Sequence, residues 1–153
     1  MSEAIKVFMD YAAEFEKTYV DNDWSRLNAY FPEDAVYEVR GGPMACRIQG
    51  REAIFKGIQK SLDGLDRRFD GREIELLEGP DIQDVPGGEE ISIAWRITYT
   101  RENCPAVQLP GRSVFAIDGG KIVAMRDEYD DAEMGELQAW IEQYGDDIDG
   151  SYV

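Results

Sequence analysis

The chain has 153 residues, the length of one ordinary domain, so a second domain with its own cofactor is not expected. Sixteen Lys and Arg against thirty-two Asp and Glu give a formal net charge of −16, and so acidic a surface repels nucleic-acid phosphates and anionic lipid headgroups. No apolar run approaches the ~20 residues of a membrane-spanning helix, and the first residues lack the basic and apolar stretches of a secretory signal. We therefore expect a cytoplasmic domain with no nucleic-acid or membrane partner.

The sequence contains no histidine and only two cysteines, Cys46 and Cys104. Histidine-dependent nucleophile systems, HExxH zinc sites and two-His-one-carboxylate iron sites are therefore excluded, and the two cysteines form no CxxC motif. The acidic run over residues 127–133 lacks the glycine-bearing loop of alternating oxygen ligands that calcium requires, so a solvated corner is expected there. We expect no metal and no cofactor, and any proton transfer must use carboxylate, Tyr, Lys or Cys side chains.

The first part of the chain shows mainly the three- and four-residue spacing of amphipathic helices. Apolar side chains recur on one face of residues 3–21, and Asp23 can cap a short helix that ends near Pro32. A third helix is predicted from Arg51 to Asp63-Gly64. Between them we expect a short strand around residues 36–39 and a loop over residues 40–50.

From about residue 68 the hydrophobic period changes to two, which is typical of strands. Strands are predicted over residues 72–79, 91–101, 112–118 and 121–129. Glycine-rich turn sequences between them favour hairpins, and therefore an antiparallel meander. Residues 131–145 have the pattern of an amphipathic helix, and the acidic tail over residues 146–153 is expected to be loose.

Three helices followed by a long meander resemble the cone-shaped NTF2-like and SnoaL-like α+β fold. Three stretches carry the resemblance: residues 23–37, residues 50–54 (GREAI) and residues 120–130 (GKIVAMRDEYD). The resemblance implies a domain over residues 1–130, in which a curved antiparallel sheet wraps around three N-terminal helices and leaves a pocket open at one end. The helix and tail over residues 131–153 would be an addition at the C-terminal side.

The last of these stretches is most similar to the limonene-epoxide hydrolases. In that branch an Asp on the last strand and a second Asp, two residues after an Arg, surround one water together with a Tyr and an Asn. Asp127 matches the last-strand Asp, Arg96 matches the Arg and Tyr37 matches the Tyr, which implies a catalytic role for these three residues. Thr98 stands in place of the second Asp and Val39 in place of the Asn, so part of the catalytic set is replaced.

Alternation places Arg96 and Thr98 on one face of their strand and an apolar row on the other face. If the polar face looks into the cone, Arg96 and Asp127 form a charged pair inside a pocket, and the apolar row is free to form a homodimer. The other interpretation of Asp127 is a purely structural ion pair with Arg96 or Arg126. The side chains expected to contact a ligand are Thr98, Met125, Tyr129, Tyr11 and Phe115.

The leading hypothesis is a protein that binds an apolar small molecule and performs cofactor-free acid or base chemistry, such as hydration, isomerisation or cyclisation, with Asp127 as the acid or base. Two alternatives stay open, a non-catalytic ligand-binding protein and a protein-interaction module. An open cavity beside Asp127 favours the first hypothesis, whereas a pocket plugged by Tyr37, Phe115 or Met125 favours the non-catalytic protein. The fold alone does not choose between them, because it hosts all three classes.

Overall fold

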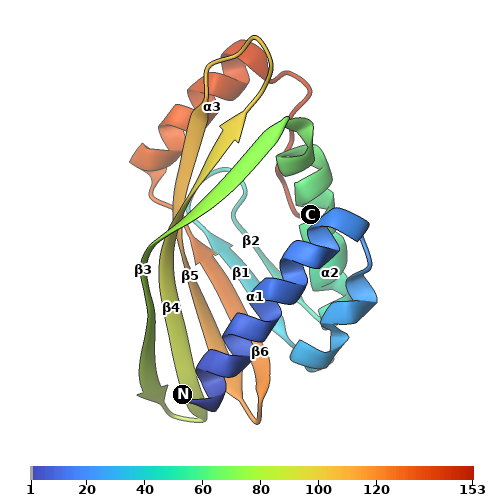
Figure 1. Cartoon of the computed structure of the whole chain (residues 1–153), viewed down its shortest axis with the longest axis vertical. Helices are drawn as coiled ribbons and strands as arrows, with labels where there is room; N and C mark the ends of the chain where they lie inside the picture. The colour runs from blue at the N-terminus through green and yellow to red at the C-terminus, as the bar shows by residue number, and fades with distance from the viewer. Residues whose placement is uncertain (1) are drawn as a thin grey trace.

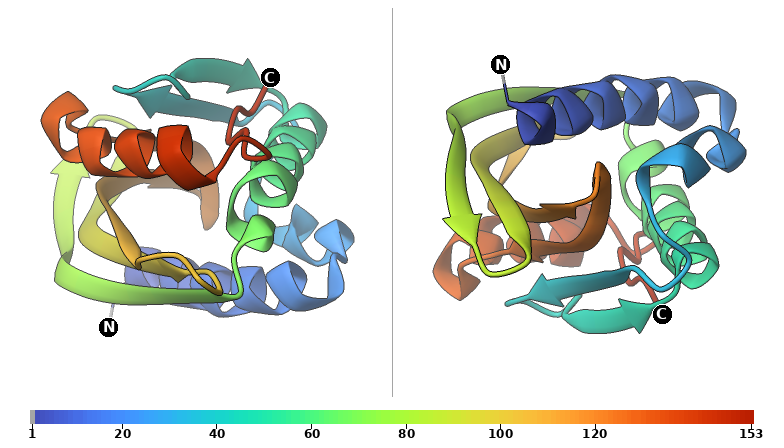
Figure 2. Two further views of the ribbon diagram at one scale, coloured as in Figure 1. Left: turned by 90° about the horizontal axis from the view of Figure 1, so that it is seen from above. Right: turned by 90° about the horizontal axis from the view of Figure 1, so that it is seen from below.

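The computed structural model describes residues 2–153, in which a strongly curved sheet encloses two helices and a third α-helix lies across one end (Figure 1). Figure 2 shows α1 and α2 along the open side of the curled sheet, with α3 across the end that is uppermost in Figure 1. In chain order the elements are α1 (Glu3–Asp21), the 3-10 helix η1 (Trp24–Tyr30), β1 (Val36–Arg40), β2 (Cys46–Gln49), α2 (Arg51–Gly64), the 3-10 helix η2 (Asp66–Arg68), β3 (Gly71–Val85), β4 (Gly88–Thr100), β5 (Val107–Asp118), β6 (Lys121–Glu128) and α3 (Asp131–Tyr144).

Side-chain caps determine where three of the helices begin. The Ser2 hydroxyl accepts a hydrogen bond from the Ile5 amide at 3.1 Å, and the Asp23 carboxylate accepts one from the Ser25 amide at 3.2 Å. The Asp130 side chain caps α3 in the same way. The three predicted N-terminal helices and the C-terminal helix are confirmed, with the middle one a 3-10 helix. None of the helices within residues 2–153 has the length and apolar character that crossing a membrane requires.

The sheet differs from the prediction in two ways. Its strand order is β2-β1-β6-β5-β4-β3, and β1 pairs with β6 in parallel, so the sheet is mixed and the expected antiparallel sheet is wrong in that detail. The predicted loop over residues 40–50 contains β2, which pairs antiparallel with β1. A strand of four residues is too short for its alternation to stand out from a loop. The parallel pairing matters for the site because it places β1 beside the strand that carries Asp127.

The long strand β3 forms one edge of the sheet. It continues past the predicted end at Gly79, through Pro80, to Val85. Proline has no amide to donate, and an edge strand tolerates it because one side of the strand needs no partner. The pairing with β4 shifts register on both sides of Glu78, which marks a bulge.

The strand β4 turns its apolar row toward the helices, which is the opposite of the conditional orientation considered above. Ile91 and Tyr99 of that row are 0% and 1% exposed. Arg96 lies on the outer face, where its Nη2 pairs with Glu75 Oε2 of β3 at 2.8 Å, and Thr98 shares that face. The apolar row is therefore covered within one chain and gives no reason for dimerisation, although the homodimer itself stays a prediction.

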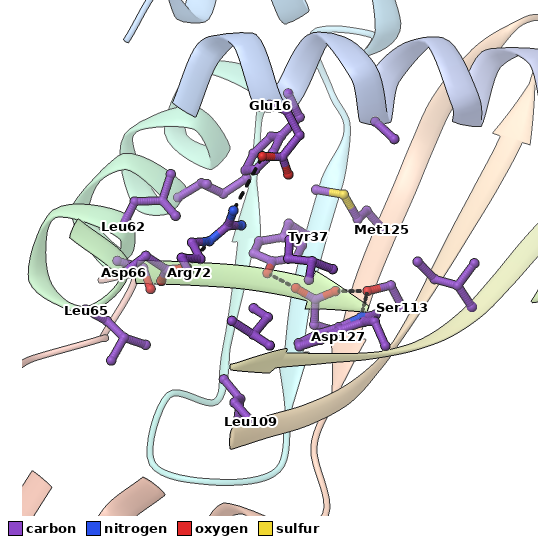
Figure 3. A pocket seen from close by; sticks show the side chains of 18 of the residues that line it. Glu16, Tyr37, Leu62, Leu65, Asp66, Arg72, Leu109, Ser113, Met125 and Asp127 are labelled. Carbon is purple, nitrogen blue, oxygen red and sulfur yellow. Dashed lines mark hydrogen bonds and ion pairs between the residues drawn. The ribbon is translucent and has the colours of Figure 1, made fainter. Parts of the chain in front are cut away.

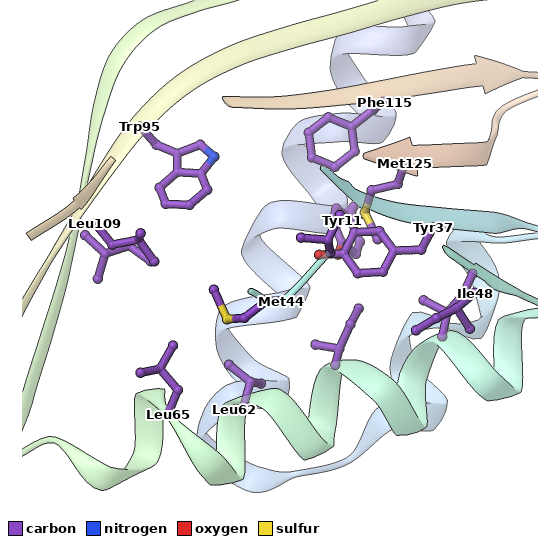
Figure 4. Close-up of a cluster of buried hydrophobic side chains, with 14 of the residues drawn as sticks. Tyr11, Tyr37, Met44, Ile48, Leu62, Leu65, Trp95, Leu109, Phe115 and Met125 are labelled. Atoms are coloured by element: carbon purple, nitrogen blue, oxygen red, sulfur yellow. Dashed lines mark hydrogen bonds between the residues drawn. The ribbon is translucent and has the colours of Figure 1, made fainter. Parts of the chain in front are cut away.

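The core fills the space between the concave face of the sheet and the helices (Figure 4). Tyr11 of α1 contacts Phe115 of β5 and Met125 of β6, Leu62 of α2 belongs to the same cluster, and all four are at most 7% exposed. These contacts hold both helices against the sheet on either side of the cavity described below.

The tail over residues 146–153 packs against α2, so the expectation of a loose tail is wrong. The Asp149 amide donates to the Gly64 carbonyl at 3.0 Å, and the Ser61 hydroxyl donates to the Gly150 carbonyl at 2.6 Å. Only glycine permits this approach at Gly64, because a Cβ there would lie 1.8 Å from the Asp149 carbonyl oxygen. The tail therefore becomes one wall of the interior.

Candidate functional site

A cavity of about 270 Å³ lies between the concave face of the sheet, α1 and α2. Its walls are mostly aliphatic and aromatic, which is typical of a site for an apolar small molecule. Six of the eight predicted site residues line it: Asp127, Tyr37, Met125, Tyr129, Tyr11 and Phe115. The other two, Arg96 and Thr98, do not, because they lie on the outer face of β4.

The cavity reaches solvent between α1 and the edge strand β3. Ile74 and Leu76 of β3 line the cavity and yet are 48% and 52% exposed. Phe15 and Glu16 of α1 line it on the opposite side. A small molecule can therefore enter past apolar side chains at the sheet edge.

Asp127 lies on the cavity wall and is held by two hydroxyl groups (Figure 3). The Ser113 hydroxyl donates to Oδ1 at 2.5 Å, and the Tyr37 hydroxyl donates to Oδ2. Strand register explains both contacts, because Ser113 of β5 stands directly opposite Asp127 of β6, and β1 runs parallel on the other side. The carboxyl group is therefore fixed in orientation by both neighbouring strands.

The surroundings shift the ionisation of this cluster. Burial raises the pKa of Asp127 above its usual range, while the hydrogen bonds from Ser113 and Tyr37 oppose that rise. Burial, followed by the nearby Asp127 charge, also raises the pKa of the Tyr37 hydroxyl well above its usual value. Tyr37 therefore keeps its proton and acts as a donor. A carboxylate whose pKa is raised is a stronger base than the same group in water.

Trp95 and Gly111 complete the support behind Asp127. The Trp95 indole donates from Nε1 to the Ser113 hydroxyl oxygen at 2.8 Å, which directs the Ser113 proton toward Asp127. Gly111 stands opposite Trp95 in the β4–β5 pair, and a Cβ at Gly111 would lie 2.6 Å from Trp95 Cζ2. The indole therefore occupies space that only glycine leaves free.

Sequence reasoning missed Ser113, although a signal for it exists. Ser113 shares the inward face of β5 with Leu109 and Phe115, so it is the polar member of an apolar row. Such a residue needs a partner when it is buried, and the partners are Asp127 and Trp95.

Both interpretations that paired Asp127 with an arginine are wrong. Arg96 pairs with Glu75, and Arg126 lies on the outer face beside Glu128, with 3.4 Å between its Nε and the Glu128 carboxylate. No ion pair within residues 2–153 includes Asp127. The side chain at position 98 also cannot replace the second Asp of the epoxide hydrolases, because it faces outward.

A second polar group lines the same cavity, and sequence reasoning missed it as well. The Arg72 Nε donates to Asp66 Oδ2 at 2.7 Å, and the Tyr99 hydroxyl donates to the same oxygen at 3.1 Å. Arg72 Nη1 reaches the Glu16 carboxylate at 3.4 Å. Arg72 begins the inward row of β3 that continues through Ile74, and this alternation was the sequence signal that could have found it. Asp66 lies in η2 and belongs to no periodic row, so no such signal exists for it.

The acidic groups that the structure describes are not arranged around a common metal centre. Within residues 2–153, no three His, Cys, Asp or Glu side chains come together in a way that could hold an ion. Asp127 accepts hydrogen bonds from hydroxyl groups, and Asp66 accepts them from a guanidinium and a phenol. The chemistry that the cavity offers from its own side chains is proton transfer and hydrogen bonding to a mostly apolar molecule.

Comparisons with known proteins agree with the fold described above. The SnoaL-like domain pattern matches residues 12–125. An NTF2-like protein from Burkholderia thailandensis E264 is 17% identical, with a TM-score of 0.63 over 90% of this chain and 98% of that chain. TerC, co-crystallised with polyporic acid, is 15% identical, with a TM-score of 0.63 over 92% of this chain and 99% of that one. A candidate polyketide cyclase from Xanthomonas campestris pv. campestris is 22% identical, with a TM-score of 0.53 over 92% and 96%.

A search among curated proteins found no match. The solved structures share the fold at identities too low to transfer an activity, and none of the comparisons singles out the limonene-epoxide hydrolases. The domain match covers most of the chain and includes α2, the strands β1 to β5 and the first part of β6. The chain therefore belongs to the SnoaL-like domain family, with the NTF2-like α+β fold.

Proposed function

We propose that this protein is a small-molecule enzyme in which Asp127 transfers a proton to or from an apolar substrate without a cofactor. The observation that carries the proposal is the position of Asp127, whose carboxyl group lies on the wall of an open, mostly apolar cavity. Burial raises its pKa, and no arginine or lysine among residues 2–153 forms an ion pair with it. A desolvated carboxylate is a stronger base than one in water, because no water shell stabilises its charge.

The hydrogen bonds leave room for this chemistry. Each carboxylate oxygen has two lone pairs, and Ser113 and Tyr37 use one on each oxygen. A substrate C–H or O–H group can approach a remaining lone pair from the cavity. Asp127 would take that proton while the electron pair moves to an electronegative atom of the substrate, and it would then return the proton at another atom. Isomerisation or cyclisation needs only such a single group.

The resemblance to limonene-epoxide hydrolases supports a narrower statement. Of the three residues that matched that branch, Asp127 and Tyr37 meet in the cavity, whereas Arg96 lies outside it. Thr98, which stands in place of the branch's second Asp, lies outside it as well. We therefore propose the acid–base role of Asp127 without the epoxide-opening mechanism. The co-crystallisation of TerC with polyporic acid supports the view that this fold accommodates small molecules, as the name of the candidate cyclase also does.

A non-catalytic ligand-binding role is the second candidate. The observation that favours it is that both oxygens of Asp127 already accept hydrogen bonds from Ser113 and Tyr37. In the non-catalytic role, the carboxylate orients Ser113 and Tyr37 and transfers no proton. The open cavity beside Asp127 argues against a pocket filled by its own side chains, so binding is expected under both candidates.

A general test of the carboxylate uses nitrobenzisoxazole as a probe. A base in an apolar pocket removes the ring C–H proton of this probe. The N–O bond of the probe then breaks, and a coloured nitrophenolate with a nitrile group forms. We expect turnover by the wild type, with a loss of about 100-fold or more in Asp127→Asn, because amides have little basicity. The matched control is Glu128→Gln, the next carboxylate on β6, which faces outward beside Arg126.

Each outcome decides between the candidates. Loss of turnover in Asp127→Asn with retention in Glu128→Gln supports proton transfer by Asp127. Binding of the probe to the wild type without any turnover that depends on Asp127 supports the non-catalytic role and overturns the proposal. Equal losses in both variants would mean that the activity does not come from this cavity.

A further inference from the structure

The second polar group of the cavity is built from three separate segments. Asp66 lies in η2, Arg72 at the start of β3 and Tyr99 on β4. The side chains of Arg72 and Asp66 are only 10% and 8% exposed, and all three residues line the cavity. Figure 3 shows Asp66 and Arg72 on one side of the cavity and Asp127 with Ser113 on the other.

The guanidinium of Arg72 has a short contact with Asp66 and a longer contact with Glu16. Its Nε contacts Asp66 at 2.7 Å, and its guanidinium lies over the Tyr19 ring at 4.5 Å from the centroid. Its contact with Glu16, at 3.4 Å, is longer, and the Glu16 side chain is 53% exposed. The hydrogen bonds of Arg72 within residues 2–153 use Nε and Nη1, so its Nη2 atom is not among the donors engaged there.

This arrangement would allow an oxygen of a ligand to replace the Glu16 carboxylate oxygen at Arg72. The planar fork of arginine binds carboxylate oxygens in pairs, and its plane is already fixed here by Asp66 and Tyr19. An anionic oxygen that replaces Glu16 leaves the charge of the cluster unchanged, because Glu16 can turn out into solvent. The rest of the ligand then meets the apolar wall between Arg72 and Asp127.

We propose that Arg72 binds a carboxylate-type oxygen of the ligand, with Glu16 as the group that it displaces. The ligand class is accordingly an apolar acid, whose ring or chain extends from Arg72 toward Asp127. This inference rests on the proposed function only in taking the cavity as the ligand site. It adds a recognition role for Arg72 and assigns it no part in proton transfer.

The test measures binding by calorimetry, without turnover, for two probes of one shape. The probes are 2-naphthoate, which carries a carboxylate, and 2-acetonaphthone, which carries a neutral carbonyl on the same ring. Glu16→Gln removes the competing anion from an exposed position, so we expect naphthoate to bind about two- to fivefold more tightly. The matched control is Glu14→Gln, which removes the same charge from α1 beside Lys17 and Arg26, outside the cavity lining.

A second variant removes the arginine without leaving a buried charge unpaired. The double variant Asp66→Asn with Arg72→Gln replaces both members of the ion pair by neutral hydrogen-bonding groups. Naphthoate affinity is expected to fall about tenfold or more, because a hydrogen bond to a charged group is lost. The affinity for acetonaphthone should change by less than about twofold, since it places no charge on Arg72.

The outcomes separate this inference from the proposal for Asp127. Equal effects on both probes would show that the pair is only structural and would overturn the inference, as would a Glu14→Gln effect equal to that of Glu16→Gln. Failure of both probes to bind the wild type would overturn it too. A probe-selective effect of Arg72 supports the inference even if Asp127→Asn leaves turnover unchanged, in which case only the catalytic proposal fails.

Discussion

The pH dependence of stability in Asp127→Asn tests directly whether the carboxyl group is buried without a cationic partner. In the unfolded chain this group titrates near its ordinary pKa of 3.8, and in the folded chain burial raises the pKa. At pH values between these two pKa values, the folded state therefore binds more protons than the unfolded state. The stability that this group contributes is fully present below pH 3.8 and is lost as the pH rises through the raised folded pKa.

The asparagine variant is neutral at every pH, so it does not suffer that loss. Its amide can accept from one of the hydroxyls of Ser113 and Tyr37 and donate to the other, because hydroxyl groups serve in both roles. Relative to the wild type, the variant should therefore gain stability as the pH rises from about 4 to 8. The gain is about 1.4 kcal/mol for each unit by which the folded pKa exceeds the unfolded one.

Urea unfolding at a series of pH values, with the wild type and the variant side by side, gives this difference. Asp147→Asn is a control of opposite sign, because the hydrogen bond from Arg101 lowers the pKa of the exposed Asp147. Its contribution is present above pH 3.8 and is lost as the pH falls through the lowered pKa. A stability loss of about 3–5 kcal/mol in Asp127→Asn at every pH would refute the reasoning, since it would indicate a stranded buried cation.

Two further predictions concern the support behind the carboxyl group. Ser113→Ala removes the donor to Asp127 and the acceptor of the Trp95 indole, so the free energy of unfolding should fall by about 2–4 kcal/mol, and urea titration across pH should show a further rise in the pKa of Asp127. Gly111→Ala places a Cβ 2.6 Å from Trp95 Cζ2, so we expect a loss of about 1–3 kcal/mol and a changed tryptophan emission. Unchanged emission would mean that the indole does not depend on the gap at Gly111.

The helices were predictable because their signals are local. Spacing of three and four residues predicted α1 as an amphipathic helix, and Asp23 and Gly64 marked helix ends within one residue of the observed ones. The buried face of α1 is turned from the predicted row, of which only Phe8 is buried, toward Ala4, Tyr11 and Thr18. The tail at residues 146–153 had no such signal. Its position depends on contacts with α2 from residues far away in the sequence, such as Ser61. No local pattern in an acidic tail indicates that it will be held in this way.

The orientation of β4 shows what alternation can and cannot decide. The pattern separated Arg96 from Trp95 correctly, but alternation alone does not say which face looks inward. Burial decides it, since each Å² of apolar surface removed from water contributes about 25 cal/mol. If the row of Trp95 and Tyr99 faced outward, the free energy from burying several apolar side chains would be lost, and one guanidinium would be buried in their place. The resemblance to the epoxide hydrolases favoured an inward position for Arg96. The burial of the apolar row outweighs that resemblance and places Arg96 on the outer face.

The same balance of free energies explains where the site residues are found. The inward rows of β5 and β6 are apolar except for Ser113 and Asp127, and the inward row of β3 begins with Arg72. A polar group in such a row is costly unless a partner lies within hydrogen-bond distance. Register supplies the partner for Asp127, because Ser113 stands opposite it. For Arg72 the partner comes from η2, a 3-10 helix of three residues whose position no periodic pattern indicates.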